Sequence, residues 1–230
     1  FILGLYRVLE TLTRDFPQVL FEGCSGGGGR FDAGMLYYTP QIWCSDDTDA
    51  IERLQIQYGT SFGYPVSAMG AHVSAVPNHQ TGRMTPLSTR GCVAMAGTFG
   101  YELDLNKLTE EEKEEISGQI RTFKEFYDCI QYGDYYRLTS PLSGSCTVWE
   151  TVAPDASEAL VSAVYHHVQA NPVPVYVKLR GLEEKASYRL SLVGKEEEMT
   201  LSGAALMHAG LPIPPAKGDY CAWQIHLIRM

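Results

Sequence analysis

Residues 19–49 read VLFEGCSGGGGRFDAGMLYYTPQIWCSDDTD, and this stretch decides the fold. It holds two short apolar runs, and each of them ends in a polar loop. The run 19–22 leads into four glycines at 26–29, and the run 41–44 leads into SDDTD at 45–49. Strands that end in glycine or carboxylate loops, with helices after them, predict parallel α/β units with an active site at the C-terminal ends of the strands.

The residues before this stretch predict an amphipathic helix over 2–14. Its apolar positions recur at helical spacing: Ile2, Leu5, Val8, Leu9 and Leu12. Pro17 ends the helix, because proline disfavours helical backbone in the residue before it. The chain begins with Phe1 inside this pattern, so we expect it to be the C-terminal part of a longer protein.

Further α/β elements follow the stretch. Asp49 and Glu52 fit a capping box ahead of a helix over 51–58, and Thr109 and Glu112 fit a second one. The second helix presents an apolar face before Gly133 closes it: Ile116, Ile120, Phe123, Tyr127 and Ile130. Between these helices the pattern predicts a strand and loop over 66–76, a short buried helix over 90–99 and a strand end at 100–104.

After about residue 135 the pattern changes to short β-rich runs separated by turn residues, such as CTVWETVA at 146–153 and CAWQIHLIRM at 221–230. This rhythm predicts a small antiparallel β-sandwich domain. A complete eight-fold β/α barrel needs about 250 residues, so the first part supplies half of one. The predicted fold is the C-terminal half of a (β/α)8 TIM barrel over 1–134, followed by an antiparallel β domain over 135–230.

Composition excludes several classes of partner. The net charge of −9 argues against nucleic acid and against a basic membrane-binding face, and no apolar run reaches the length of a membrane span. The six cysteines form no CxxC pair. Such usage favours free thiols in a reducing compartment, which predicts a cytoplasmic protein.

The glycine run does not fit the common nucleotide-binding motifs. A phosphate loop needs Lys-Ser or Lys-Thr after its last glycine, and Arg30-Phe31 follows Gly29 instead. A dinucleotide fingerprint would need helix-forming sequence directly afterwards. A mobile linker is the structural alternative, but the run lies between a strand and the aromatic segment FDAGMLYY. We expect a loop that lets a small ligand approach backbone N–H groups.

The carboxylates after the second strand are the candidate catalytic groups. Asp49 is explained as a helix cap, whereas Asp46 and Asp47 have no such explanation. Either could act in acid/base chemistry, beside the flat apolar ring of Trp43, on which a sugar can stack. The alternatives are a solvated acidic turn or a Mg²⁺ or Ca²⁺ site built from the DDxD oxygens.

The histidines give weaker signals. His72 and His79 are seven residues apart across a proline, which is poor spacing for zinc, so we interpret both as hydrogen-bonding residues at the barrel rim. We interpret His166, His167 and His208 as surface or packing residues. Ser25 lies in CSGGG and not in GxSxG, and no nucleophilic triad is legible.

Several long blocks, in order, resemble glycoside hydrolase family 36 α-galactosidases. They are LFEGCSGGGGRFDAGMLYY (20–38), QIWCSDDTDAIERLQIQYGTS (41–61), GAHVSAVPNHQTGR (70–83), GYELDLN (100–106) and GLPIPPAKGDYCAWQIHL (210–227). The resemblance covers essentially the whole chain, as the C-terminal half of such an enzyme. It implies a retaining enzyme on a (β/α)8 barrel that removes terminal α-linked galactose from raffinose-type or melibiose-type sugars. It also implies a homo-oligomer, often a tetramer, when full length, with no metal and no cofactor.

The resemblance implies roles for individual residues. In the family's SDxxD block the first aspartate is the acid/base, which falls on Asp46. The CSGGG block lines the galactose subsite, which assigns substrate binding to Cys24, Ser25, Gly26 and Gly27, with Trp43 near the sugar. Arg53, in the DAxxRLxxQ block, would support the site without touching substrate.

One departure from the family pattern bears on activity. The family's nucleophile is an aspartate in a KWDxN block, and these 230 residues contain no such block. We therefore expect the isolated chain to be inactive. An α-galactosyl transglycosylase, an α-N-acetylgalactosaminidase and a non-catalytic carbohydrate-binding fragment stay open as alternatives.

Overall fold

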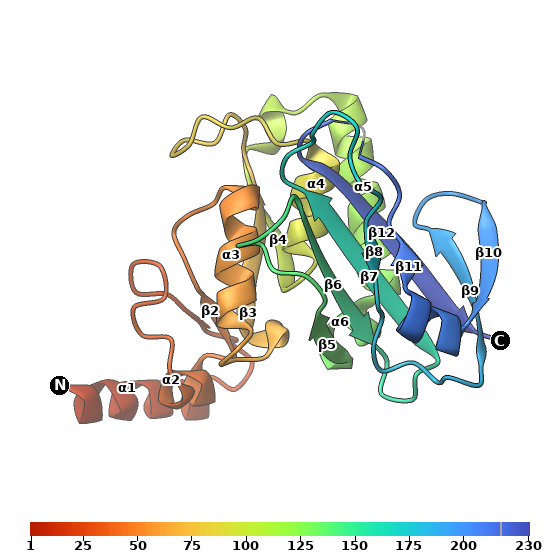
Figure 1. Cartoon of the computed structure of the whole chain (residues 1–230). Coiled ribbons are helices and arrows are strands. Elements are labelled where there is room, and N and C mark those ends of the chain that lie inside the picture. The colour runs from red at the N-terminus through yellow and green to blue at the C-terminus, as the bar shows by residue number, and fades with distance from the viewer. Residues whose placement is uncertain (217) are drawn as a thin grey trace.

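The computed structural model describes residues 1–216 and 218–230, and it contains two main sheets (Figure 1). The first is a four-stranded parallel sheet in the order β1-β2-β3-β4. Its strands are β1 (Glu22–Gly23), β2 (Gln41–Trp43), β3 (Met69–Ser74) and β4 (Thr98–Glu102). Each strand therefore pairs with the next one along the chain, as in consecutive units of a β/α barrel.

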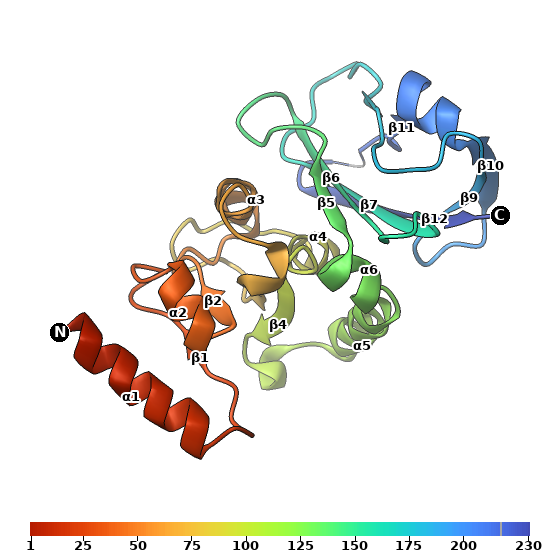
Figure 2. The same ribbon diagram turned by 90° about the horizontal axis from the view of Figure 1, so that it is seen from below.

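Helices connect and flank these strands. They are α1 (Ile2–Asp15), α2 (Ala33–Tyr38), α3 (Ala50–Thr60), α4 (Leu87–Ala94), α5 (Glu110–Glu125) and α6 (Tyr127–Tyr132), with short 3-10 turns at Val66–Ala68 and Leu105–Lys107. The outer face of β3 packs on this helical layer, where Val73 meets Leu87, Ala94 and Ile116. Figure 2 shows α1 extending away from the other elements, and no residue of α1 is buried.

The second sheet has six strands in the order β10-β9-β12-β7-β6-β5. The strands are β5 (Asp134–Arg137), β6 (Cys146–Val152), β7 (Glu158–Tyr165), β9 (Ser187–Leu192), β10 (Glu198–Ser202) and β12 (Cys221–Arg229). All its pairings are antiparallel. A short second layer covers one face: the two-stranded sheet of β8 (Tyr176–Val177) and β11 (Leu211–Pro212), and a π-type helix over Ala205–Ala209.

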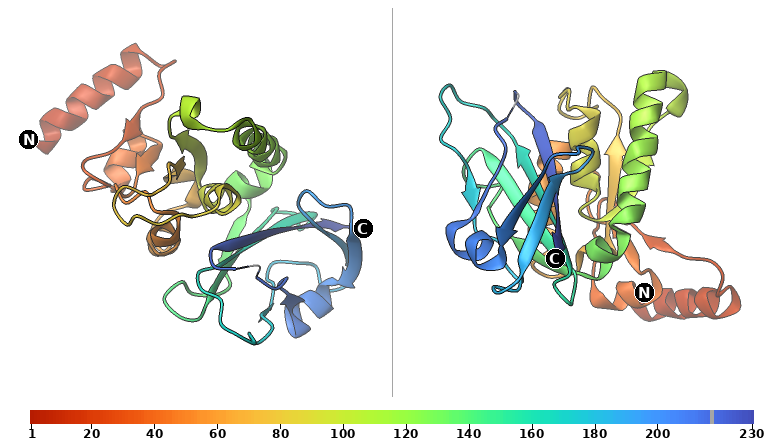
Figure 3. Two further views of the ribbon diagram at one scale, coloured as in Figure 1. Left: turned by 90° about the horizontal axis from the view of Figure 1, so that it is seen from above. Right: turned by 90° about the vertical axis from the view of Figure 1, so that its right-hand side faces the viewer.

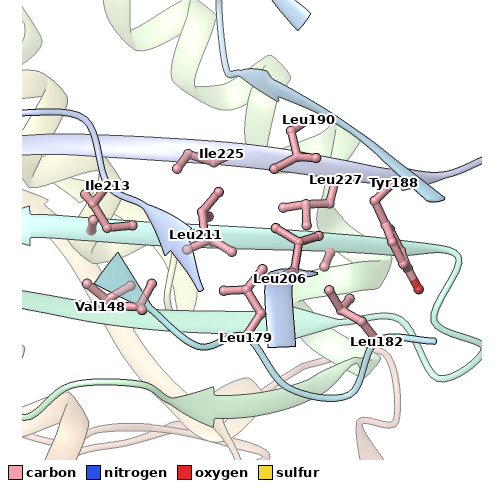
Figure 4. Close-up of a cluster of buried hydrophobic side chains, with 14 of the residues drawn as sticks. Val148, Leu179, Leu182, Tyr188, Leu190, Leu206, Leu211, Ile213, Ile225 and Leu227 are labelled. Carbon is pink, nitrogen blue, oxygen red and sulfur yellow. The ribbon is translucent and has the colours of Figure 1, made fainter. Parts of the chain in front are cut away.

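Both faces of the six-stranded sheet are buried. Figure 4 shows the core between the sheet and its short second layer, where Val148 and Ile225 from the strands meet Leu206 and Leu211. The opposite face packs on the helices of the first part, where Trp149 and Val164 join a cluster with Leu54 and Val93. In Figure 3 the helix α4 accordingly lies between the two sheets, in contact with β3 and β12. Burial on both sides explains why every residue of β6 is buried and why β7 reads as a nearly continuous apolar run.

The structure confirms most predicted elements and corrects others. The short helix predicted over 90–99 lies at Leu87–Ala94, because residues 98–102 form β4 instead. The first strand was predicted over 19–22 but lies at Glu22–Gly23, because β1 pairs only with β2 and Leu20 is exposed. The helix predicted from Thr109 to Gly133 breaks at Phe126 into α5 and α6.

Another correction concerns the helix cap of α3. The Asp49 side chain accepts from the backbone N–H groups of Ile51 and Glu52 as predicted, but the reciprocal half of the capping box is wrong. The Asp49 N–H donates to Asp47 Oδ1, and Glu52 pairs with Arg83 instead.

Candidate active site

The predicted site residues gather at the C-terminal ends of β1 and β2, where the two loops after these strands pack against each other. A Cβ atom on Gly27 would lie 2.8 Å from the Asp46 backbone nitrogen, and one on Gly28 would lie 2.9 Å from the Cys44 carbonyl oxygen. Both glycines also have positive φ angles of 74° and 85°. The contact and the backbone conformation both require glycine at these two positions, which explains why the loop after β1 contains a run of glycines.

Asp46 has an exposed side chain, and among the described residues it has no hydrogen-bond or ion-pair partner. Asp47 differs, because its Oδ1 accepts the Asp49 N–H at 3.0 Å and its own N–H donates to Ser45 Oγ at 3.1 Å. The Asp47 carboxylate therefore builds the turn, while the Asp46 carboxylate stays available to a ligand. Geometry thus separates two residues that spacing alone left equivalent.

Trp43 lies on the inner face of the parallel sheet between two protein groups. The His72 ring stacks on it with centroids 4.5 Å apart, and the Arg53 guanidinium carbon lies 4.5 Å from its ring centroid. His72 Nδ1 is 3.5 Å from Glu102 Oε2, which is too long for a hydrogen bond but close enough for an electrostatic contact. His72 and Arg53 thus cover much of the indole ring on which a sugar was predicted to stack.

Arg53 is 2% exposed and lies at the base of the loop that carries Asp46. Its Nη1 donates to the Ser45 carbonyl at 3.1 Å, and its Nη2 donates to the Gly70 carbonyl. Nε donates to Gln57 Oε1. Burial lowers the pKa of the guanidinium, yet an arginine stays charged in a protein.

The other side of the same loop is held by the segment 77–83. Asn78 Nδ2 donates to Thr48 Oγ1 at 3.0 Å, and Gln80 Oε1 accepts the Thr48 N–H at 3.1 Å. Arg83 pairs with the buried Asp49 carboxylate. Burial alone would raise the pKa of Asp49, but hydrogen bonds from Thr81, the Ile51 N–H and Arg83 outweigh it, so the pKa lies below its ordinary value.

The structure places Cys24, Ser25, Gly26 and Gly27 in the loop after β1. Within that loop Gly27 borders Asp46, and Gly28 borders Cys44. His72 stacks on Trp43, whereas His79 lies in the segment 77–83. Glu22 and Glu102 on the inner face were not singled out, because their neighbours become visible only once the strands are paired. Among the described residues, no three His, Cys, Asp or Glu side chains could hold a metal ion.

Comparison with known families places this geometry in context. The sequence model described as Melibiase matches residues 1–133, and the one described as Glycosyl hydrolase family 36 C-terminal domain matches residues 146–227. Similar curated proteins include the bifunctional alpha-galactosidase/sucrose kinase AgaSK of Mediterraneibacter gnavus, 56% identical over 224 residues, which cover 97% of this chain and 24% of that protein. The alpha-galactosidase AgaA of Geobacillus stearothermophilus is 49% identical over 231 residues, covering 100% of this chain and 31% of AgaA. The chain therefore spans 24% to 31% of the length of these relatives.

Solved structures match the fold closely. The galactosidase domain of AgaSK has a TM-score of 0.94 and 55% identity, and the match covers 99% of this chain and 31% of that one. A variant of AgaA in complex with raffinose has the same TM-score and coverage with 49% identity. These matches confirm the predicted fold class, a barrel segment followed by an antiparallel β domain. No helix in the described part of the chain is long and apolar enough to cross a membrane.

Proposed function

This chain belongs to the Melibiase family and carries the C-terminal domain of glycosyl hydrolase family 36, and from that premise we propose that it supplies the acid/base half of a retaining α-galactosidase site. Asp46 is the proposed acid/base. The nucleophile is an aspartate from a segment that these 230 residues do not contain. The substrate is a terminal α-linked galactose on a raffinose-type or melibiose-type oligosaccharide.

The proposed reaction is a double displacement. A retaining glycosidase uses two carboxyl groups about 5–5.5 Å apart, one as nucleophile and one as acid/base. Asp46 first donates its proton to the leaving glycosidic oxygen while the nucleophile forms the galactosyl-enzyme. It then takes a proton from the water that attacks this intermediate. Two carboxyl groups are sufficient for both steps, so the proposal includes neither a metal nor an organic cofactor.

One observation carries the proposal: the Asp46 carboxylate has no partner among the described residues, although the backbone on either side of it is firmly held. Unpaired carboxylates with fixed backbones at the C-terminal ends of parallel strands are typical of catalytic groups. Asp47 lacks this freedom because its carboxylate accepts a backbone N–H.

The loop beside Asp46 is the proposed galactose subsite. Cys24 and Ser25 offer side-chain groups, and Gly26 and Gly27 let the sugar approach the backbone. We keep Trp43 as a substrate-lining residue, but its contact with the sugar must use the part of the ring that His72 and Arg53 leave uncovered.

Other parts of the proposal rest on the family alone. AgaA structures contain raffinose and stachyose, which supports α-galactosides as the substrate class here. We also propose a cytoplasmic homo-oligomer, a tetramer when full length, that binds neither nucleic acid nor membranes. The division of the chain near residue 134 is part of the proposal, and the separate parallel and antiparallel sheets support it.

A chimera tests the function. In it, these 230 residues replace the matching segment of Geobacillus AgaA, which aligns with the whole chain. We expect the chimera to hydrolyse an aryl α-galactoside and raffinose, and the 230 residues alone to hydrolyse neither. Asp46→Ala should lower kcat/KM on raffinose by about 10²–10⁴, the usual contribution of a general acid. It should change kcat/KM on an activated aryl galactoside far less, because that leaving group needs no proton.

Two controls make the result decisive. Azide should restore turnover of the aryl substrate by Asp46→Ala, because it replaces the water that the base activates. A folded chimera that hydrolyses neither substrate, while unmodified AgaA hydrolyses both, would refute the proposal. Product analysis with an added sugar acceptor separates hydrolysis from transglycosylation.

A further inference from the structure

The pairing of β2 with β3 ends where the loop that carries Asp46 begins. The last residues that these two strands pair are Trp43 and Gly70, and from there to Ser74 β3 is paired with β4 only. The Gly70 carbonyl therefore has no further β2 residue to pair with. Arg53 from α3 fills this position, because its Nη2 donates to the Gly70 carbonyl and its Nη1 donates to the Ser45 carbonyl. The guanidinium thus bridges the two strands at the point where their ladder stops.

Neighbouring side chains also fix the orientation of the Arg53 guanidinium. Gln57, one turn along α3, accepts from Arg53 Nε at 3.3 Å and donates to the Val93 carbonyl at 3.0 Å, which ties α3 to α4. Trp43 covers the guanidinium plane. A rigid planar fork that holds two carbonyls is a task that the single ammonium of lysine cannot perform.

The peptide unit between Ser45 and Asp46 is consequently held at both of its ends. Arg53 binds the carbonyl oxygen of this unit, and Gly27 packs so closely against its nitrogen that a Cβ at position 27 would lie only 2.8 Å from it. Because a peptide unit is planar and stiff, fixing its oxygen and its nitrogen fixes the position of the Asp46 Cα atom. The next peptide unit is restrained as well, because the Asp47 N–H donates to Ser45 Oγ at 3.1 Å, and together these restraints limit the directions in which the Asp46 side chain can leave the backbone.

We propose that Arg53 is a positioning residue for the acid/base carboxylate. By binding the Ser45 and Gly70 carbonyls, it keeps the Asp46 carboxyl within hydrogen-bonding distance of the glycosidic oxygen. This inference rests on the proposed function. A general acid must come within about 2.6–3.2 Å of the atom that it protonates, and a misplacement of about 1 Å costs on the order of a hundredfold in rate. Arg53 touches neither substrate nor the reacting atoms.

The positioning role makes a prediction that a merely structural role does not. Loss of the bridge should harm reactions in proportion to their need for the proton. In the chimera, Arg53→Lys should raise the ratio of kcat/KM on an activated aryl galactoside to kcat/KM on raffinose by about ten- to a hundredfold, by the same misplacement argument. Its KM for the aryl substrate should stay close to that of the parent, because Arg53 makes no hydrogen bond with the proposed sugar-binding residues Cys24 to Gly27 and contacts Trp43 only through the ring face.

Arg90 provides a matched control in the same chain. It is a second buried arginine, on α4, and its guanidinium also binds two backbone carbonyls, those of Ser74 and Thr85. None of its hydrogen bonds reaches the loop 44–49. Arg90→Lys should therefore lower the melting temperature as Arg53→Lys does, and leave the ratio between the two substrates unchanged.

The outcomes separate the two proposals. If Asp46→Ala fails to raise the ratio, the proposed function is wrong. If Asp46→Ala raises it and Arg53→Lys does not, or if Arg90→Lys raises it equally, the positioning role is wrong. Should Arg53→Lys fail to fold, Gln57→Met keeps the guanidinium but removes the group that orients it. That variant should raise the ratio in the same direction by a few-fold, and an unchanged ratio would overturn the inference.

Discussion

Glu150 should make the stability of the six-stranded sheet depend on pH. Its side chain is 0% exposed and lies on the same face of β6 as Val148 and Val152. Oε2 accepts the Arg180 N–H at 2.9 Å, and Oε1 has no partner in the part of the chain that the structure describes. Burial raises the pKa of this carboxyl to about 8, against a smaller opposing effect of Arg180. The carboxyl is therefore neutral in the folded protein at pH 7.

The sign and size follow from the difference between the two states. The unfolded chain has an ordinary glutamate with a pKa near 4.5, so the folded state holds the proton more tightly. The tighter proton binding by Glu150 stabilises the folded state fully below pH 4.5, and this stabilisation is lost as the pH rises through about 8. At about 1.36 kcal/mol for each pH unit in that window, the free energy of unfolding should fall by about 3 kcal/mol between pH 5 and pH 7.5.

The assay compares urea unfolding of the whole chain with that of Glu150→Gln at pH 5, 6, 7 and 7.5. Trp149 and Trp223 lie in the six-stranded sheet and report its unfolding by fluorescence. From pH 5 to pH 7.5 the free energy of unfolding of the parent should fall by about 3 kcal/mol relative to that of Glu150→Gln, because glutamine has no proton to lose. Glu197→Gln, at an exposed position, is the control and should show no such trend. A parent and a Glu150→Gln variant with parallel pH profiles would refute the reasoning.

Three further changes test the loop and the helix caps. Gly27→Ala should destabilise the chain by about 1–3 kcal/mol more than Gly26→Ala in urea unfolding, because both have positive φ but only a Cβ on Gly27 meets backbone atoms. Asp47→Asn should leave kcat/KM of the chimera on raffinose near the parent value, since the amide oxygen still accepts the backbone N–H, whereas Asp46→Asn should lower it by about 10²–10⁴. Equal losses for the two would contradict the assignment. Thr109→Ala should cost about 1 kcal/mol of unfolding free energy and Thr109→Ser much less, because only alanine removes the oxygen that caps α5.

Local sequence signals predicted the elements whose causes are local. Thr109 caps α5 with its reciprocal glutamate, and Asp49 caps α3, because each cap needs only residues within the first turn. The strand predicted over 19–22 shifted because strand limits depend on a partner, and β1 has one only at Glu22 and Gly23. The predicted long helix broke at Phe126, which turns inward to pack with Ile130 and Leu160 of β7.

The candidate site was predictable in its residues but not in their roles. Spacing identified Asp46 and Asp47 together, and only the hydrogen bond from the Asp49 N–H to Asp47 separates them. The sequence showed a glycine run, but not that Gly27 presses on the backbone of Asp46. In the sequence, Glu150 looks like a solvent-exposed glutamate of a strand in which polar and apolar residues alternate. Its burial arises from the second layer of the β domain, which lies more than 25 residues further along the chain.

The loop 44–49 shows how this fold can combine rigidity with an available carboxylate. Three separate segments hold its backbone: the glycine loop through Gly27, α3 through Arg53, and the segment 77–83 through Asn78 and Arg83. Arg83 in turn lies 5.6 Å from the ring of Tyr220, which precedes β12, so the β domain also contributes to this support. Because each restraint acts on the backbone or on a neighbouring side chain, none of them consumes the oxygens of Asp46. An acid/base group needs this combination, since a paired carboxylate would have to break its bond before it could exchange a proton.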